Sequence, residues 1–318
     1  MWLPDVHTWE DQKPHIERLK EKLAQLNALR PLPASAVNKI RESLSIEWTY
    51  NSNSIEGNTL TLRETQIIIQ EGLTVGGKSL REHFEAVNHE KAIHYLYGLV
   101  SDNYQLRGID ILSLHELIMK NIDDDFAGRI RNGAVRITGA NFNPPAPSKV
   151  SELLDELIGF VNSNPLNLND VELAAVFHHR LVWIHPFFDG NGRTTRLAMN
   201  LLLMRRGYPP AIILKNDRKK YYDALNKANN GDYSKLILLV IQALERSLNI
   251  YLNATPSYQE YQEISLLAEE PGIPYGAEYI SLLARTGKID AHKEGKNWLT
   301  TKTALEKYIS EKKKHKPV

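Results

Sequence analysis

Residues 185–196 read His-Pro-Phe-Phe-Asp-Gly-Asn-Gly-Arg-Thr-Thr-Arg, a polar run between two apolar segments. Residues 171–184, before this run, carry leucine, alanine, valine, phenylalanine and isoleucine at helical intervals, and residues 197–204, after it, are apolar nearly all round. Both patterns are typical of helices that are buried in a core. The sequence therefore predicts a loop between two buried helices, which opens into the N-terminus of the second helix.

The residue types of this loop suit a ligand that carries phosphate groups. The first turn of a helix leaves backbone N–H groups unpaired and partly positive, which favours anions. Gly190 and Gly192 let the backbone come close to a ligand. Arg193 and Arg196 are three residues apart, so they lie on one face of the helix and can both bind phosphate oxygens.

Asp189 and His185 add the remaining chemistry. The Asp189 carboxylate is an oxygen ligand suited to Mg²⁺ between two phosphates, and the ordinary pKa of His185 makes it a base at neutral pH. Each feature alone also occurs in plain helix caps and turns, but their combination predicts a nucleotide polyphosphate site with a base beside it. No Gly-Lys-Ser/Thr follows the loop, which excludes a P-loop.

Residues 185–196 resemble the full HPFx(D/E)GNGRxxR signature of the Fic family, whose members transfer AMP from ATP to protein hydroxyls, with no departure at a fixed position. The resemblance implies that His185 acts as the base toward the target hydroxyl and that Asp189 binds Mg²⁺. It also implies phosphate contacts, to the α-phosphate from Gly190, Asn191 and Gly192, to the β-phosphate from Arg193 and to the γ-phosphate from Arg196. Attack at the α-phosphorus expels pyrophosphate, so charge must be stabilised on both sides of that atom.

A second motif, Ser52-xxx-Glu56-Gly57, ends a helix that is predicted to run from residue 34 to 55. Ser52 and Glu56 face the same way on a helix, and Gly57 is a typical C-cap. The motif resembles the family's inhibitory (S/T)xxxE(G/N) sequence, in which the glutamate pairs with the second arginine, here Arg196. A carboxylate about 4 Å from a γ-phosphate charge costs roughly 4 kcal/mol per charge pair at an effective dielectric near 20, so the protein is expected to be largely inactive as encoded.

Two alternatives remain for Glu56. It could be a solvated residue at an ordinary helix end, or it could position a water that removes AMP, which would make the protein bifunctional.

Residues 221–229 resemble the family's downstream YYxxLxxAN stretch. Tyr222 and Asn229 match its adenine-contacting positions, where an aromatic face stacks and an amide both donates and accepts hydrogen bonds. An amphipathic helix with a polar cap is the alternative. His178 and His179 diverge by about 100° on a helix, since successive residues are spaced 3.6 per turn, and no glutamate completes a zinc motif, so the sequence argues against zinc.

Alternation in residues 127–139, with Gly139 and then Pro144 and Pro145, predicts a β-hairpin, which in the family is a flap over the nucleotide. Its exposed edge would align the target segment by strand addition. A plain surface loop is the alternative. Residues 85–90 resemble an upstream family pattern and are expected to pack around the floor of the active site.

The remaining periodicity predicts a mainly α protein, a Fic-type helical bundle with a small C-terminal winged helix-turn-helix-like domain. The expected division is N-terminal helices with the inhibitory helix (1–60), a catalytic core (61–254) and the winged-helix-like domain (258–318). Residues 285–318 hold ten Lys/Arg against four Asp/Glu. A basic wing suggests DNA contact, but such domains also dock proteins. The alternative function is therefore a DNA-binding regulator whose nucleotide site is only a sensor.

Composition sets further limits. The 318 residues carry 39 Lys/Arg and 38 Asp/Glu, so no whole-chain field argues for nucleic acid or a membrane. The absence of cysteine excludes disulfides and thiol catalysis. The first residues lack a leader pattern, and no apolar run in the sequence reaches the length expected of a membrane span, so we expect a cytoplasmic protein. The expected cofactors are ATP and Mg²⁺ and the expected partner is a protein with a target hydroxyl. Because many relatives form dimers, a homodimer is also expected.

Overall fold

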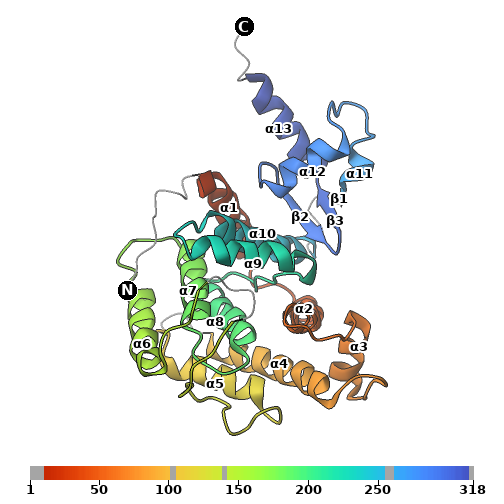
Figure 1. Cartoon of the computed structure of the whole chain (residues 1–318). Coiled ribbons are helices and arrows are strands. Elements are labelled where there is room, and N and C mark those ends of the chain that lie inside the picture. The colour runs from red at the N-terminus through yellow and green to blue at the C-terminus, as the bar shows by residue number, and fades with distance from the viewer. Residues whose placement is uncertain (1–10, 101–104, 138–141, 255–260, 315–318) are drawn as a thin grey trace.

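The computed structural model describes residues 11–100, 105–137, 142–254 and 261–314 (Figure 1). The mainly helical fold predicted from the sequence is confirmed. Its first part consists of α1 (Lys13–Ala28), α2 (Ala34–Ile55), α3 (Leu62–Gln66), which continues as the π-helix η2 (Ile67–Glu71), α4 (Leu80–Leu99) and α5 (Gly108–Met119). The second part consists of α6 (Pro147–Ser163), α7 (Asp170–Ile184), α8 (Asn191–Arg205), the 3₁₀ turn η3 (Lys215–Asp217), α9 (Arg218–Ala228) and α10 (Ser234–Asn253).

Local sequence explains where several helices begin. The Asn169 side chain accepts hydrogen bonds from the backbone of α7, and the Glu172 carboxylate accepts one from the Asn169 N–H. Ser79 and Glu82 form the same capping box at α4. These boxes satisfy N–H groups that a helix cannot pair internally. They fix the start of α4 and α7, the two helices that carry residues toward the α8 N-terminus.

The core is centred on α8, which packs against α7, α5 and α4. Its apolar face is sealed, with Leu197, Leu201 and Leu203 fully buried. Among the described residues, α10 is the one helix long and apolar enough to cross a membrane, although the sequence suggested no such run, and 72% of its apolar window is buried inside the protein. It packs against α1, α7 and α9 and is therefore a core helix.

The hairpin predicted in residues 127–139 is not found within the described residues. Residues 129–137 and 143–146 form no paired strand, and residues 138–141 lie outside the described part of the chain. The reason lies in Arg131, whose backbone N–H donates to the Pro186 carbonyl at 2.9 Å. Its guanidinium donates to the carbonyls of His185 (2.7 Å), Gly133 (3.0 Å) and Pro145 (2.6 Å). The segment is thus tied to the α7–α8 loop instead of to a second strand.

The C-terminal part contains β1 (Gln262–Glu263), α11 (Ile264–Leu267), α12 (Ala277–Arg285), β2 (Ala291–Glu294), β3 (Asn297–Thr300) and α13 (Lys302–Lys314). The strands form an antiparallel sheet in the order β1-β3-β2. Two helices, a β-hairpin and a last helix follow one another here, which is the order of a winged helix-turn-helix. The apolar residues of the C-terminal part form a core separate from that of the helical bundle.

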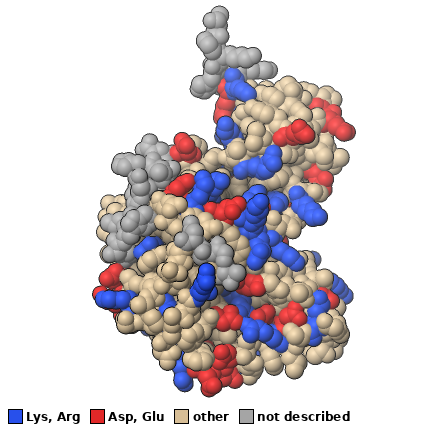
Figure 2. All heavy atoms as spheres, viewed as in Figure 1, with Lys and Arg blue, Asp and Glu red and all other residues tan. Residues whose placement is uncertain are grey.

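The C-terminal part packs on α1 and α10 through buried charges. Lys22 of α1 donates to Asn249 (2.5 Å), Tyr261 (2.9 Å) and Asp290 (2.6 Å). Arg18 pairs with the buried Glu245 of α10 at 2.5 Å. On the face shown in Figure 2, Lys and Arg are interspersed with Asp and Glu over both parts of the molecule.

Candidate functional site

The α7–α8 loop places His185 at its start. α7 ends at Ile184, and His185 caps it in the left-handed conformation (φ 51°, ψ 62°), with its N–H donating to the Leu181 carbonyl at 3.1 Å. The Nδ1 atom lies 3.3 Å from the Val182 carbonyl. A carbonyl can only accept, so Nδ1 carries the proton and Nε2 is the basic nitrogen. Burial lowers the pKa of His185 to about 4, so the imidazole is neutral at physiological pH.

Asn191 fixes the shape of the loop. Its side-chain oxygen accepts from the Phe187 N–H at 3.0 Å and its amide donates to the Phe187 carbonyl at 2.8 Å. The Asn191 side chain is buried, and both its oxygen and its amide nitrogen are hydrogen-bonded to Phe187. The resemblance implied that Asn191 helps to hold the α-phosphate, which stays a prediction. Because the side chain is hydrogen-bonded to Phe187, that contact would come from the backbone N–H in the first turn of α8.

The two glycines of the loop are required by their surroundings. Gly190 has φ 72°, and a Cβ there would lie 3.0 Å from the sulfur of Met119 and 3.2 Å from the His115 ring. A Cβ on Gly192 would overlap the Glu56 carboxylate. That carboxylate therefore lies directly against the first turn of α8, the position that favours an anion.

Glu56 and Ser52 hold the second arginine. Arg196 Nη1 forms an ion pair with Glu56 Oε1 at 2.8 Å. Its Nε donates to Ser52 Oγ at 3.0 Å and its Nη2 to the Ser52 carbonyl at 2.9 Å. The Arg196 side chain is 2% exposed and that of Glu56 is 33% exposed. The ion pair that the resemblance implied between these two residues is present.

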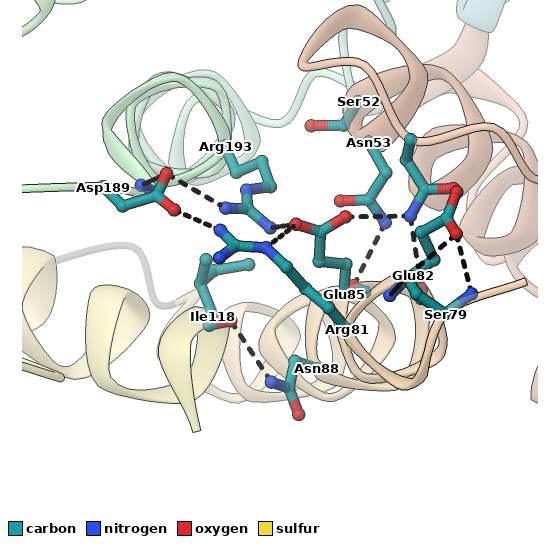
Figure 3. Close-up of polar contacts among 12 residues, drawn as sticks. Ser52, Asn53, Ser79, Arg81, Glu82, Glu85, Asn88, Ile118, Asp189 and Arg193 are labelled. Atoms are coloured by element: carbon teal, nitrogen blue, oxygen red, sulfur yellow. Dashed lines mark hydrogen bonds and ion pairs between the residues drawn. The ribbon is translucent and has the colours of Figure 1, made fainter. Parts of the chain in front are cut away.

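Arg193 belongs to a closed ring of four charges, which we call the α4 ring (Arg81, Glu85, Asp189 and Arg193). Arg193 pairs with Glu85 at 3.1 Å and with Asp189 at 3.5 Å, and Arg81 pairs with Glu85 at 3.3 Å and with Asp189 (Figure 3). Arg81 and Glu85 come from α4, and the other two from the loop and α8. The charges of the ring sum to zero.

Asp189 is an ionised, accessible carboxylate. Burial opposes ionisation, but the Arg193 charge, the Gly190 N–H and Arg81 together hold the pKa of Asp189 below its ordinary value. Its Oδ1 accepts from the Gly190 N–H at 2.5 Å. Mg²⁺ in nucleotide sites is commonly held by one or two carboxylates together with substrate phosphates. A single half-exposed carboxylate beside a helix N-terminus fits that cation.

The predicted adenine residues lie on α9. Tyr222 is partly buried beside Tyr221, with the Arg218 guanidinium 4.9 Å from its ring centre. Asn229 Oδ1 lies 2.9 Å from His179 Nε2. His179 Nδ1 also contacts the Tyr233 hydroxyl at 2.7 Å, and His178 contacts the Tyr221 hydroxyl at 2.8 Å. His178 is thus held by Tyr221 of α9, and His179 by Asn229, which caps α9, and by Tyr233, which precedes α10.

Sequence reasoning missed several residues of this site. Arg81 had no motif, Glu85 was assigned only to packing, and Arg131 was assigned to the hairpin. His115 was also missed: its ring stacks on Phe187 at 3.6 Å, accepts from the Gly128 N–H at 3.0 Å and lies 3.0 Å from the Asp189 carbonyl. Burial lowers the pKa of His115 to about 4. Contacts between residues of different helices leave no pattern in the sequence. The one available signal was the spacing of Arg81 and Glu85, which lie four residues apart and so on the same face of a helix.

The chain is similar to known proteins over most of its length. The model of the Fic/DOC family matches residues 106–203. The protein adenylyltransferase Fic of Aedes aegypti is 37% identical over 287 residues, which cover 90% of this chain and 56% of that protein. The protein of the same name from Culex quinquefasciatus is 39% identical over 82% of this chain and 51% of its own length. The chain thus spans about half the length of the curated relatives it matches.

The fold of most of the chain also resembles solved structures. Fic-1 (residues 134–508) from C. elegans superposes with a TM-score of 0.69 at 34% identity, covering 77% of this chain and 72% of that one. A Fic domain-containing signalling protein from Bacteroides thetaiotaomicron gives a TM-score of 0.68 at 28% identity, covering 76% of this chain and 97% of that one. With its signature loop intact and its fold shared with these proteins, the chain belongs to the Fic/DOC family.

Proposed function

We propose that this chain is a protein adenylyltransferase, which transfers AMP from ATP to a serine, threonine or tyrosine hydroxyl of a protein. One observation carries the proposal: His185, Asp189, Arg193 and Arg196 converge on the first turn of α8, and the Glu56 carboxylate lies against that turn. A carboxylate held at a helix N-terminus by a buried arginine marks the place of a phosphate. The names of the similar proteins support AMP as the transferred group.

The residues of the loop divide the work on the triphosphate. Arg193 and Arg196 bind the oxygens of the β- and γ-phosphates, and Gly190 and Gly192 let the N–H groups of the first turn approach the α-phosphate. Asp189 would hold Mg²⁺, which neutralises charge on the bridging phosphate oxygens. Charge that develops on the pyrophosphate leaving group is thereby stabilised by fixed groups.

His185 supplies the base. Its Nε2 accepts the proton of the target hydroxyl while the hydroxyl oxygen forms a bond to the α-phosphorus. The bond from that phosphorus to the pyrophosphate oxygen breaks, so AMP is left as an ester on the target and pyrophosphate departs. Arg131 holds the His185 carbonyl at 2.7 Å and so keeps the imidazole at the edge of the loop.

Glu56 makes the enzyme self-inhibited. Its carboxylate takes one donor of Arg196 and lies where the γ-phosphate would bind. The repulsion amounts to roughly 4 kcal/mol per charge pair at 4 Å and an effective dielectric near 20, which is about a thousandfold in binding. Tyr222 and Asn229 are the proposed adenine contacts, one by stacking and one through its amide.

The test is labelling with ATP that carries its label on the α-phosphate. We expect weak self-labelling of the unmodified chain and strong labelling of Glu56→Gly. In the Glu56→Gly background, His185→Ala should lower the rate about 10²–10⁴-fold, as loss of a general base does. A matched control is Glu42→Ala, which removes an exposed carboxylate from the same helix and should leave labelling low.

Unchanged labelling in the His185→Ala form would contradict the mechanism. Mass spectrometry of a lysate treated with the Glu56→Gly form and ATP identifies the transferred group and the modified protein. Release of AMP from a modified target by the unmodified chain would instead support the bifunctional alternative.

DNA binding through the C-terminal part stays a prediction from the sequence, as does a homodimer. Among the described lysines there, Lys293 pairs with Asp217 and Lys302 with Glu270, and α12 begins with the acidic Glu278. These pairings remove two lysines from the charge that DNA contact could use. A gel shift with the whole chain at low salt, with its salt slope, tests the point.

A further inference from the structure

Arg81 lies near the start of α4, where a positive charge does not favour the helix. Its side chain is 54% exposed. Its guanidinium is directed at Asp189 of the α7–α8 loop and keeps a second contact with Glu85 of its own helix (Figure 3). The contact with Asp189 therefore accounts for the placement of Arg81.

The two oxygens of Asp189 have different partners. Oδ1 accepts from the Gly190 N–H at 2.5 Å and faces Arg193 at 3.5 Å, so it is committed to the shape of the loop. Oδ2 is the atom that Arg81 contacts. A cation that binds Asp189 and leaves the loop in place therefore meets Arg81 at Oδ2, where the two positive charges repel each other.

We propose that Arg81 is a positioning residue that competes with Mg²⁺ for Asp189 and so sets the cation concentration at which the nucleotide binds. The proposal rests on the proposed function, because it assumes that MgATP binds at this loop. When Arg81 leaves Asp189, Glu85 still holds its guanidinium, so the displaced side chain stays at the mouth of the site. Two positive charges at one carboxylate oxygen repel each other, so the Arg81 contact and Mg²⁺ weaken one another, and this coupling is equal in both directions.

The test measures binding and not catalysis. A fluorescent ATP analogue is titrated with Mg²⁺ against Glu56→Gly and against Glu56→Gly with Arg81→Gln. We expect the second protein to half-saturate at a Mg²⁺ concentration about two- to fivefold lower, the range of an exposed ion pair. In EDTA, where there is no competitor, the two proteins should bind the analogue equally.

Glu56→Gly with Arg63→Gln is the matched control, because it removes an exposed arginine charge from the neighbouring α3, where its partner is Gln66. This control should leave the Mg²⁺ dependence unchanged. An unchanged or higher Mg²⁺ requirement in the Arg81→Gln protein would overturn the proposal, as would an equal loss of affinity with and without Mg²⁺. Failure of the Glu56→Gly protein itself to bind the analogue would instead refute the proposed function.

A separate set of contacts joins the β2–β3 turn of the C-terminal part to the end of α2. Lys293 Nζ contacts Asp217 Oδ1 at 2.8 Å, and Asn216 Nδ2 donates to the Gly295 carbonyl at 2.9 Å. In Figure 1 the tip of this hairpin is directed toward α2. The hairpin therefore holds η3, the short turn that precedes α9.

The same turn holds the last turns of α2. The Lys215 N–H donates to Asn51 Oδ1 at 2.8 Å, and Arg218 Nε donates to the Ile55 carbonyl at 2.7 Å. Ile55 is the last residue of α2 and precedes Glu56 directly. Residues of η3 thus contact the hairpin and Asn51 of α2, and the next residue, Arg218 at the start of α9, contacts the backbone beside Glu56.

We infer that the C-terminal hairpin positions Glu56, so a partner that displaces the hairpin weakens the inhibition. This inference also rests on the proposed function, but on contacts that do not include Arg81. Lys293→Ala together with Asn216→Ala should raise self-labelling about two- to tenfold, the effect of losing one ion pair and one hydrogen bond. In the Glu56→Gly background the same pair of substitutions should change nothing, because the inhibitory group is already gone.

Lys302→Ala is the control, since it removes a lysine of the C-terminal part whose partner is Glu270 of the same part. An equal increase of labelling in both backgrounds, or no increase in either, would overturn the inference. Melting temperatures of all forms should accompany the assay, so that general loosening is separated from release of Glu56. If Glu56→Gly shows no labelling at all, the proposed function fails first.

Discussion

Two regions of the molecule bury charge, and they do so in opposite ways. Where α1 meets α10 and the C-terminal part, Lys22 and Glu245 are sealed, and Lys22 also has two neutral partners, Asn249 and Tyr261. At the α8 N-terminus Arg193 and Arg196 are sealed as well, but their acidic partners Glu56 and Asp189 reach solvent.

The difference lies in the partner and not in the cation. The acids at the site are more exposed than the acid of the interface pair: the Glu56 side chain is 33% exposed and that of Asp189 is 48% exposed, against 24% for Asp290. Lys22 also keeps its buried neutral partners Asn249 and Tyr261, so it stays paired without a ligand. A buried cation whose acid lies nearer the surface can exchange that acid for a ligand of the same charge.

The contrast between the two regions fails if the Lys22–Asp290 pair contributes nothing to stability. Lys22→Met removes the cation and keeps most of its volume, leaving Asp290 without its nearest positive charge. We expect the free energy of unfolding to fall by about 3 kcal/mol, the range for a broken buried pair. Denaturant unfolding followed by tryptophan fluorescence measures it. Lys20→Met, two residues away with an exposed partner in Glu17, should cost less than about 1 kcal/mol.

The site pair should respond more weakly in stability. Glu56→Gln keeps an oxygen for Arg196, and Ser52 keeps its two hydrogen bonds to the guanidinium. We expect a loss of about 1 kcal/mol or less in the same unfolding assay, together with increased self-labelling. A loss as large as that of Lys22→Met would show that the two regions are built alike.

The stability of the folded protein should depend on pH through four histidines. Burial lowers the pKa of His115, His179 and His185 to about 4 and that of His178 to about 3. A histidine whose folded pKa lies below its ordinary value of about 6.5 is neutral in the folded protein and takes up a proton on unfolding. Stability should therefore be constant above about pH 6.5 and fall as the pH drops toward 4, which unfolding at stepped pH tests.

The catalytic consequence is separate. Because His185 stays neutral down to about pH 4, self-labelling of Glu56→Gly should not decline between pH 8 and 6 through protonation of this base. A sigmoidal loss of activity centred near pH 6.5 would show that the imidazole is as solvated as a free histidine.

The sequence predicted the parts of this site that lie within continuous motifs. The α7–α8 loop, the Ser52–Glu56 pair and the aromatic α9 follow from helical spacing and from residue chemistry. Pairing between distant elements did not follow, so Arg81, His115 and Arg131 were missed. The hairpin prediction was wrong within the described residues because alternation cannot reveal that Arg131 prefers the carbonyls of the neighbouring loop.

Asn191 also shows the limit of a motif. The resemblance implied a contact with the α-phosphate, which stays a prediction, but it did not indicate that the side chain closes the loop on Phe187. That closure depends on backbone geometry, which no side-chain pattern encodes.

Calorimetric titration of MgATP into the unmodified chain and into Glu56→Gly tests the central claim most directly. If the Glu56 carboxylate holds the place of a phosphate, removing it should tighten binding by one to three orders of magnitude, up to the roughly 4 kcal/mol of one charge pair. Equal affinities for the two proteins, or no binding by Glu56→Gly, would contradict the account.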